Sequence, residues 1–223
     1  MGTKHILPTL GMAFALLGAG TVANAQFIAI NVNAPATGNR TDFSTPVGEK
    51  FNVINSISVL SLGAFDSGQN GFVNPITASL YNATTNALLG RVTFTNASPG
   101  TLASGSAFRF QTLGAAINLT PGSYVIAAEG FGASDPFADN LTQTTNTGGG
   151  AISFGNAQYG FTPLVMPSQD AGSPNIYAAA SFQYQIGFIA ATPEPGSVGL
   201  SLVSGLFGAG FAVRRRRIAR NSA

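Results

Sequence analysis

The chain has 223 residues, and its formal net charge of +2 hides an uneven distribution. Six of the ten basic residues lie among the first five or last ten positions, so residues 26–191 keep four basic and seven acidic side chains, a net charge of −3. Nucleic-acid backbones are bound mainly through Lys and Arg, so this balance excludes nucleic acid as a partner. Cysteine is absent and the single histidine is His5, which excludes disulfides, zinc sites built on Cys or His, and a Ser-His-Asp triad from residues 26–191.

The first 25 residues have the features of a secretory signal peptide. Lys4 lies in a short polar segment, the run from Ile6 to Val22 is uncharged, and Ala23 and Ala25 supply the small residues of a cleavage site. We expect signal peptidase to cut after Ala25, so that the mature chain starts at Gln26. The alternative is an uncleaved membrane helix, for which the apolar run is near the lower length limit.

Residues 26–191 predict a single all-β domain, a β-sandwich of jelly-roll-like type. The main signal is alternation of apolar and polar residues with period 2, which indicates strands with one buried face. Short strands spaced about every ten residues and separated by Gly and Asn turns are typical of this class. The alternating apolar positions are Ile76, Ala78, Leu80; Val92, Phe94; Phe108, Phe110; and Phe182, Tyr184, Ile186, Phe188.

Two longer apolar runs predict central strands with both faces covered, and polar stretches predict the turns between strands. The runs are 54–62 and 124–128, and the turns are 65–71, 82–86 and 120–122. Two further stretches are expected to be irregular. Residues 33–46 predict a surface crossing, and 134–150, with three consecutive glycines, predicts a mobile loop where binding activity is expected.

No cofactor or catalytic group is expected in this domain. Asp66 and Asn70, with Asp135 and Asp139, are weak candidates for a calcium site because calcium prefers oxygen ligands. The spacing does not fit an EF-hand, and ordinary Asx-turns explain the same residues. A glycosidase would need Glu129 close to a second carboxylate, and nothing in the sequence predicts such a pair.

Several side chains have both a binding and a packing interpretation. Tyr81, Tyr159, Tyr177 and Tyr184 could contact carbohydrate, but tyrosine on a strand favours packing against the sheet. Arg109 lies between two phenylalanines and is expected on the opposite face, solvated or paired across strands.

The last 32 residues, 192–223, have three parts in a fixed order. Pro193, Glu194 and Pro195 come first, residues 196–213 follow without a charge, and Arg214, Arg215, Arg216 and Arg217 come last. An apolar run of about 18 residues is just long enough for a transmembrane helix. The arginines predict that its far end stays in the cytoplasm and acts as a stop-transfer signal.

This order of Pro-Glu-Pro, short membrane helix and basic tail resembles the PEP-CTERM sorting signal of exported bacterial proteins. The resemblance implies recognition by a membrane-embedded exosortase and cleavage near the Pro-Glu-Pro. A GPI anchor is the alternative, but such signals end in the apolar segment, whereas arginines follow it here.

Residues 51–130 resemble a sandwich domain found in many exported PEP-CTERM proteins, with Phe72 and Phe110 as departures where Leu and Tyr are usual. The resemblance implies fold and location but no reaction. It is carried by these strings: Leu62-Gly63, Phe65-Asp66, Asn70-Gly71-Phe72, Leu80-Tyr81, Leu88-Leu89-Gly90, Phe108-Arg109-Phe110 and Tyr124-Val125-Ile126.

Together these features predict a non-enzymatic surface or extracellular-matrix protein. Its expected partners are signal peptidase, an exosortase, the inner membrane (transiently) and exopolysaccharide. We expect a precursor anchored in the inner membrane and a product in the cell envelope or outside the cell. The alternative function is a carbohydrate-binding module acting in that matrix.

Overall fold

The computed structural model describes residues 25–42 and 44–188, and their regular structure is all β apart from one short 3-10 helix. Every strand pair among these residues is antiparallel. The all-β class predicted from the sequence is therefore confirmed. The helix is η1 (Ser67–Gln69), which lies in the connection between two long strands.

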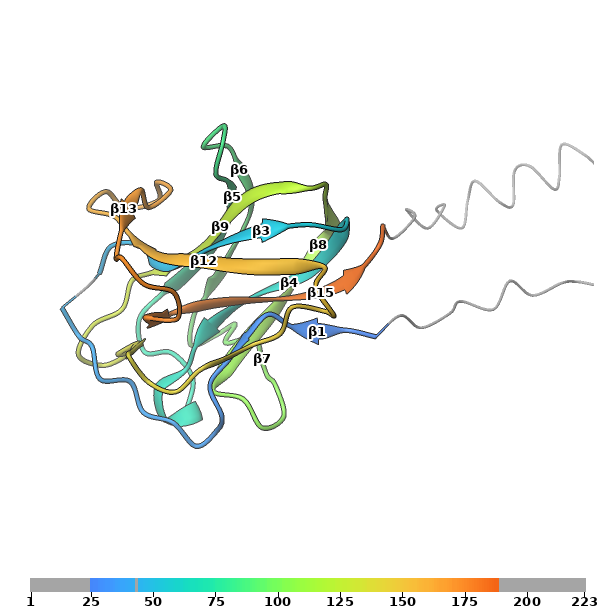
Figure 1. The fold of residues 1–223 in the computed structure, drawn as a ribbon. Helices are drawn as coiled ribbons and strands as arrows, with labels where there is room; N and C mark the ends of the chain where they lie inside the picture. Colours follow the sequence, from blue (N-terminus) through green and yellow to red (C-terminus); the bar gives the residue numbers. More distant parts are fainter. Residues whose placement is uncertain (1–24, 43, 189–223) are drawn as a thin grey trace, which may run out of the picture.

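Two large sheets contain most of the strands (Figure 1). The six-stranded sheet has the order β13 (Gln169–Asp170), β12 (Ile152–Tyr159), β3 (Val47–Val53), β9 (Gly122–Glu129), β5 (Ile76–Asn82) and β6 (Leu88–Phe94). The five-stranded sheet has the order β1 (Phe27–Ile28), β15 (Ala180–Ile186), β4 (Ile57–Phe65), β8 (Phe108–Leu119) and β7 (Thr101–Leu102). Two small sheets pair β10 (Ala138–Asp139) with β14 (Tyr177–Ala178), and β11 (Thr144–Thr145) with β2 (Ile30–Asn31).

The two large sheets share one hydrophobic core. Phe51 of β3 and Phe182 of β15 are fully buried, and their ring centroids lie 4.7 Å apart across the gap between the sheets. The chain passes from one large sheet to the other six times, at β1–β3, β3–β4, β4–β5, β6–β7, β8–β9 and β13–β15. These crossings bring apolar faces from both sheets together, and the core contains no disulfide because the chain has no cysteine.

The alternation predicted for the strands is confirmed where both sheets cover them and fails at one end. Ile76, Ala78 and Leu80 are fully buried, as is Tyr184 of β15. Ile186 is 42% exposed, because β15 ends there and the sequence pattern continues past the covered part of the sheet. Phe188 is also exposed, which corrects the prediction that it belongs to the buried face.

The prediction that strand 124–128 is covered on both faces is also confirmed. Tyr124, Ile126 and Ala128 belong to the shared core, whereas Val125 and Ala127 point to the other side of the six-stranded sheet and are nevertheless buried. β4 is likewise buried along nearly its whole length. Segments outside the large sheets must therefore pack on their outer faces.

The predicted turns join strands where the sequence indicated. Asn82 Oδ1 accepts hydrogen bonds from the amides of Thr84 and Thr85 at the tip of the β5–β6 hairpin. Residues 65–71 connect β4 to β5, and the Thr120-Pro121 pair connects β8 to β9. Residues 33–46 carry isolated bridges and no strand before Val47, apart from position 43, which is not described.

The prediction of a single irregular loop over residues 134–150 is wrong. This segment contains β10 and β11, each paired with a distant strand, and Phe137 within it is fully buried. Strands of two residues carry no readable period, so the sequence pattern could not reveal them. The three glycines at 148–150 do form a turn, with positive φ at each.

Both ends of the described body leave from the same side of the molecule (Figure 1). This follows from the pairing of β1 with β15, which places Phe27 opposite Tyr184. Ala23, the Pro-Glu-Pro motif, segment 196–213 and the four arginines lie outside the described residues, and Ala25 is an exposed residue at their start. Within residues 25–42 and 44–188, no helix has the length and apolarity needed to cross a bilayer.

Candidate functional site

A loop, residues 160–168, lies over the outer face of the six-stranded sheet and is fixed there through Leu164. The Leu164 amide donates to both carboxylate oxygens of Glu129 on β9, each at 2.9 Å. The Leu164 carbonyl accepts from Arg91 Nη2 on β6 at 3.0 Å. Leu164 has a φ of 60°, which is unusual for a residue other than glycine, so these two side chains hold an uncommon backbone conformation in place.

Arg91 is held in one orientation by neutral groups. Its Nε donates to Ser79 Oγ at 2.9 Å, and its Nη2 donates to Tyr81 Oη at 3.1 Å as well as to Leu164. Ser79 and Tyr81 are buried beneath the loop. Among the described residues, no hydrogen bond involves Arg91 Nη1, so part of the guanidinium is available for another acceptor.

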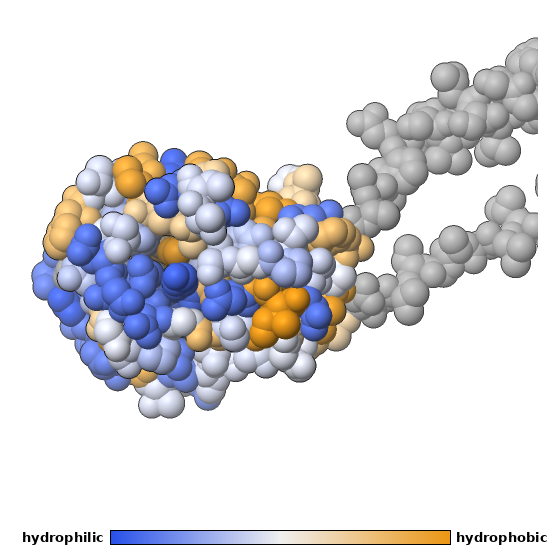
Figure 2. Space-filling model, turned by 45° about the horizontal axis from the view of Figure 1, so that its top comes forward, coloured by the Kyte–Doolittle hydropathy of each residue, from blue (hydrophilic) through white to orange (hydrophobic). Residues whose placement is uncertain are grey.

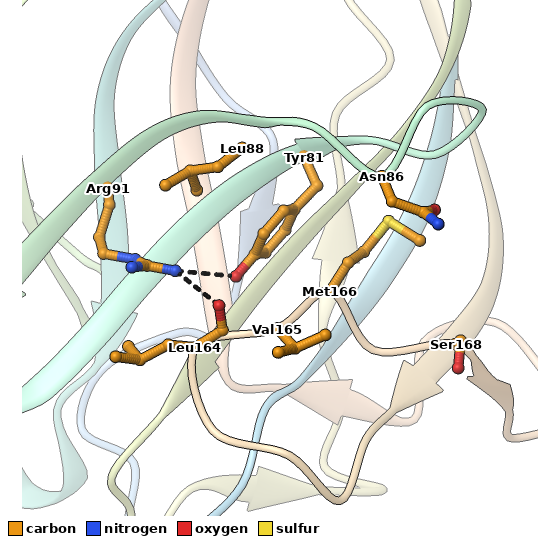
Figure 3. A pocket seen from close by; sticks show the side chains of 8 residues that line it. All are labelled: Tyr81, Asn86, Leu88, Arg91, Leu164, Val165, Met166 and Ser168. Atoms are coloured by element: carbon orange, nitrogen blue, oxygen red, sulfur yellow. Dashed lines mark hydrogen bonds between the residues drawn. The ribbon is translucent and has the colours of Figure 1, made fainter.

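Between this loop and the β5–β6 hairpin is a hollow of about 400 Å³, a size that suits a small molecule (Figure 3). Figure 3 shows Arg91 and Tyr81 on the sheet side, with Leu164, Val165 and Met166 entering from the loop. Its lining combines these residues with Asn86, Leu88 and Ser168. The hollow therefore presents one cation, three neutral polar groups and several apolar side chains.

Three of the exposed large apolar side chains in the described residues line this hollow. Leu88, Leu164 and Val165 are 46%, 53% and 51% exposed. One face of the molecule carries separate hydrophobic patches among hydrophilic and neutral residues, and its most hydrophilic area lies away from the ends of the described body (Figure 2). Apolar groups left in water beside a fixed cation are what a ligand site offers before its ligand binds.

Electrostatics at the hollow depend on Glu129 and Arg91. Burial raises the pKa of Glu129, while the Leu164 amide and the nearby Arg91 charge oppose that shift. No direct ion pair joins the two side chains among the described contacts, since the Leu164 peptide lies between them. Arg91 thus has no carboxylate in direct contact, although Glu129 reduces the positive potential around it.

The four calcium candidates do not come together as one site. Asp66 is fully buried and forms an ion pair with Arg109, and its two oxygens also accept from the Gly71 amide at 3.1 Å. Asp135 accepts from the amides of Val73 and Asn74 at 3.0 and 2.8 Å.

Asp139 forms an ion pair with Arg40. The side-chain amide of Asn70 donates to the backbone carbonyls of Ser67 and Gly71. Within the described residues, no three acidic or histidine side chains could share a metal ion. The carboxylates therefore close loops and balance arginines. Arg109 of β8 is ion-paired as one of the two sequence interpretations predicted, but its partner Asp66 lies directly after β4 and not on a strand.

The tyrosines proposed for carbohydrate contact serve mainly in packing. Tyr81, Tyr177 and Tyr184 are buried, and Tyr159 is partly buried with its ring 5.6 Å from that of Phe161. Phe161 is 71% exposed and was not predicted as a candidate. Only Tyr81 reaches the hollow, where its hydroxyl group contacts Arg91.

The hollow itself was missed by the sequence analysis. None of its lining residues lies within 134–150, where binding activity was predicted. The available signals were Arg91, one of four basic residues in an acidic body, and the apolar run 164–166 between two prolines. Neither signal reveals that the two segments meet, because 73 positions separate Arg91 from Leu164.

A second unpredicted group, Glu49, lies on the core side of β3, away from the hollow. It is fully buried, Gln143 Nε2 is 3.5 Å from its Oε1, and its Oε2 has no partner. Burial raises the pKa of Glu49 to about 8, against the opposing effects of Gln143 and the backbone amides of residues 175–177. The signal was present, since Glu49 alternates with buried Val47 and Phe51.

No protein-family model matches the chain, and no curated protein is significantly similar to it. The geometry of the hollow and the sequence are therefore the basis for any functional proposal.

Proposed function

We propose that this chain is a non-enzymatic exported protein of the bacterial surface or extracellular matrix, sorted and cleaved by an exosortase. The observation that carries this proposal is the ordered tail of Pro193-Glu194-Pro195, 18 uncharged residues and four arginines, together with an N-terminal leader. The tail resembles a PEP-CTERM signal. The product is associated with the envelope or exopolysaccharide.

The finer fold within this proposal is a β-sandwich of jelly-roll-like type. It is supported by two antiparallel sheets that share one core and by the six connections that cross between them. A cysteine-free body of this kind does not depend on disulfide formation to fold after export. The fold by itself assigns no activity.

Mass spectrometry of both ends of the protein recovered from the cell surface tests the proposal. The expected product starts at Gln26 and ends close to Pro195. A variant with Pro193→Ala and Pro195→Ala should retain its tail and remain in the inner membrane. Surface protein that still contains Arg214 to Arg217 would contradict cleavage, and a reporter joined after Ala223 that proves to be outside the cytoplasm would contradict the topology.

A carbohydrate-binding module is the second candidate function, and the hollow beside Arg91 favours it. The hollow combines apolar walls with hydrogen-bonding groups, which is the combination that sugar rings need. The binding activity is proposed for this hollow and no longer for residues 134–150. Deleting that segment would remove buried Phe137 and two strands, so it would test folding instead of binding.

A further inference from the structure

Within residues 25–42 and 44–188, Arg91 differs from Arg40 and Arg109 in having no carboxylate partner in direct contact. Arg40 pairs with Asp42 and Asp139, and Arg109 pairs with Asp66. The three hydrogen bonds of Arg91 go to two hydroxyl groups and one carbonyl group, which carry no formal charge. They orient the guanidinium group without neutralising it.

We infer that the hollow beside Arg91 binds a carboxylate-bearing sugar, with Arg91 Nη1 donating to the sugar carboxylate. Hydrogen bonds between arginine and a carboxylate are charge-assisted and stronger than neutral ones. Since Ser79, Tyr81 and Leu164 already hold the guanidinium in place, little side-chain entropy is lost when the ligand binds. This inference rests on the carbohydrate-binding candidate and names its ligand class.

The remaining lining residues distinguish a sugar from simpler anions. Leu88, Val165 and Met166 offer apolar surface for the C–H face of a sugar ring. Asn86 and Ser168 offer amide and hydroxyl groups that can pair with ring hydroxyls. A phosphate ion would leave the apolar walls without a partner, and a fatty carboxylate would leave the polar groups unpaired.

Glu129 limits how many negative charges the site accepts. Its carboxylate lies behind the Leu164 peptide and reduces the positive potential at Arg91. One carboxylate per bound sugar matches this arrangement, whereas a densely charged anion such as a polyphosphate would be repelled. The ligand class is therefore a uronate, either free or as a residue of an acidic polysaccharide.

Isothermal titration calorimetry on the full chain, purified in a mild detergent, tests this inference. The probes are galacturonate, a short galacturonate oligomer and neutral galactose. We expect galacturonate to bind at least about tenfold more tightly than galactose, because the charge-assisted contact is missing from the neutral sugar. Tighter binding of the oligomer would identify a polymer as the ligand source, and equal binding per sugar residue would identify a free uronate.

Three variants locate the binding. Arg91→Gln should weaken galacturonate binding by about tenfold or more. Leu88→Asp should also weaken it, because the added carboxylate at this exposed lining position repels the sugar carboxylate and competes for Arg91. Lys50→Gln removes the same charge from β3, outside the hollow, and should leave affinity unchanged. Thermal unfolding of each variant separates lost binding from lost folding, which matters because Arg91 also holds the loop.

Equal binding of galacturonate and galactose, or equal weakening by Arg91→Gln and Lys50→Gln, would overturn the inference. So would a folded Leu88→Asp variant that binds galacturonate as the parent does. Absence of any uronate binding would overturn it too and would leave the export proposal intact, since the masses of the chain ends test export separately.

Discussion

Replacing Glu49 with glutamine should remove most of the pH dependence of folding stability between about pH 5 and pH 8. In the folded body Glu49 is fully buried and its pKa is raised to about 8, whereas its ordinary value is 4.5. An unfolded chain therefore releases this proton at a lower pH than the folded chain does. Between the two values the unfolded state binds fewer protons, so stability falls as pH rises.

The size of the effect follows from the same shift. Each pH unit in this window costs about 1.4 kcal/mol, and the full titration removes about 5 kcal/mol at most. Protonation also gives Glu49 a hydrogen to donate, and the neighbouring Gln143 has a buried Oε1 with no partner. Because an amide supplies a permanent donor at the same place, Glu49→Gln should keep the packing and lose the titration.

Chemical unfolding of the full chain in mild detergent, repeated from about pH 5 to about pH 9, measures this difference. Tyrosine fluorescence or circular dichroism must report unfolding because the chain has no tryptophan. Asp170→Asn, which removes an exposed acid, is the matched control and should give a curve parallel to that of the parent. Parallel curves for the parent and Glu49→Gln would refute the assignment of a neutral, buried Glu49.

Three other predictions concern stability. Asp66→Ala leaves the partly buried Arg109 without its fully buried carboxylate partner and should cost about 3 kcal/mol in chemical unfolding. Asp42→Asn, in an exposed ion pair, should change little, and similar losses for the two variants would contradict this. Gly48→Ala would place a methyl group 1.9 Å from the Ile126 carbonyl oxygen and should lower the midpoint of thermal unfolding strongly. The methyl group of the control Gly114→Ala would meet no atom within 4 Å, so equal midpoints for the two variants would refute the close approach at Gly48. Tyr184→Phe loses the 2.8 Å hydrogen bond to the Asn146 carbonyl, so it should lower the free energy of unfolding by about 1 kcal/mol and speed limited proteolysis at residues 148–150. Unchanged cleavage there would show that this hydrogen bond does not hold the turn in place.

Local sequence patterns predicted the all-β class and several strands because burial on one face of a strand leaves a period of two. Ile76, Ala78 and Leu80 follow that rule and are buried. The rule fails at Ile186 and Phe188, where the pattern continues but the covering sheet does not. A pattern records which side of a strand is apolar, and it contains no information on how far the opposite sheet extends.

The candidate site could not be predicted in the same way, because its parts are distant in sequence. Arg91 is fixed by a carbonyl 73 positions away, and Glu129 by an amide 35 positions away. Residues 160–168 have no regular structure to signal their position. The calcium hypothesis failed for a different reason: the sequence shows suitable turns but not the partners of their carboxylates. Asp66 is paired with Arg109, and Asp135 accepts hydrogen bonds from the backbone amides of Val73 and Asn74.

The pairing of β1 with β15 has a consequence for maturation. Seven positions separate Ile186, the last residue of β15, from Pro193, and such a segment extends no more than about 25 Å. If an exosortase cuts near Pro193 as proposed, it must work within that distance of the folded body. Within the described residues, β15 is the last strand and ends at Ile186, so we expect steric access, and not unpairing of strands, to limit the rate of the proposed release.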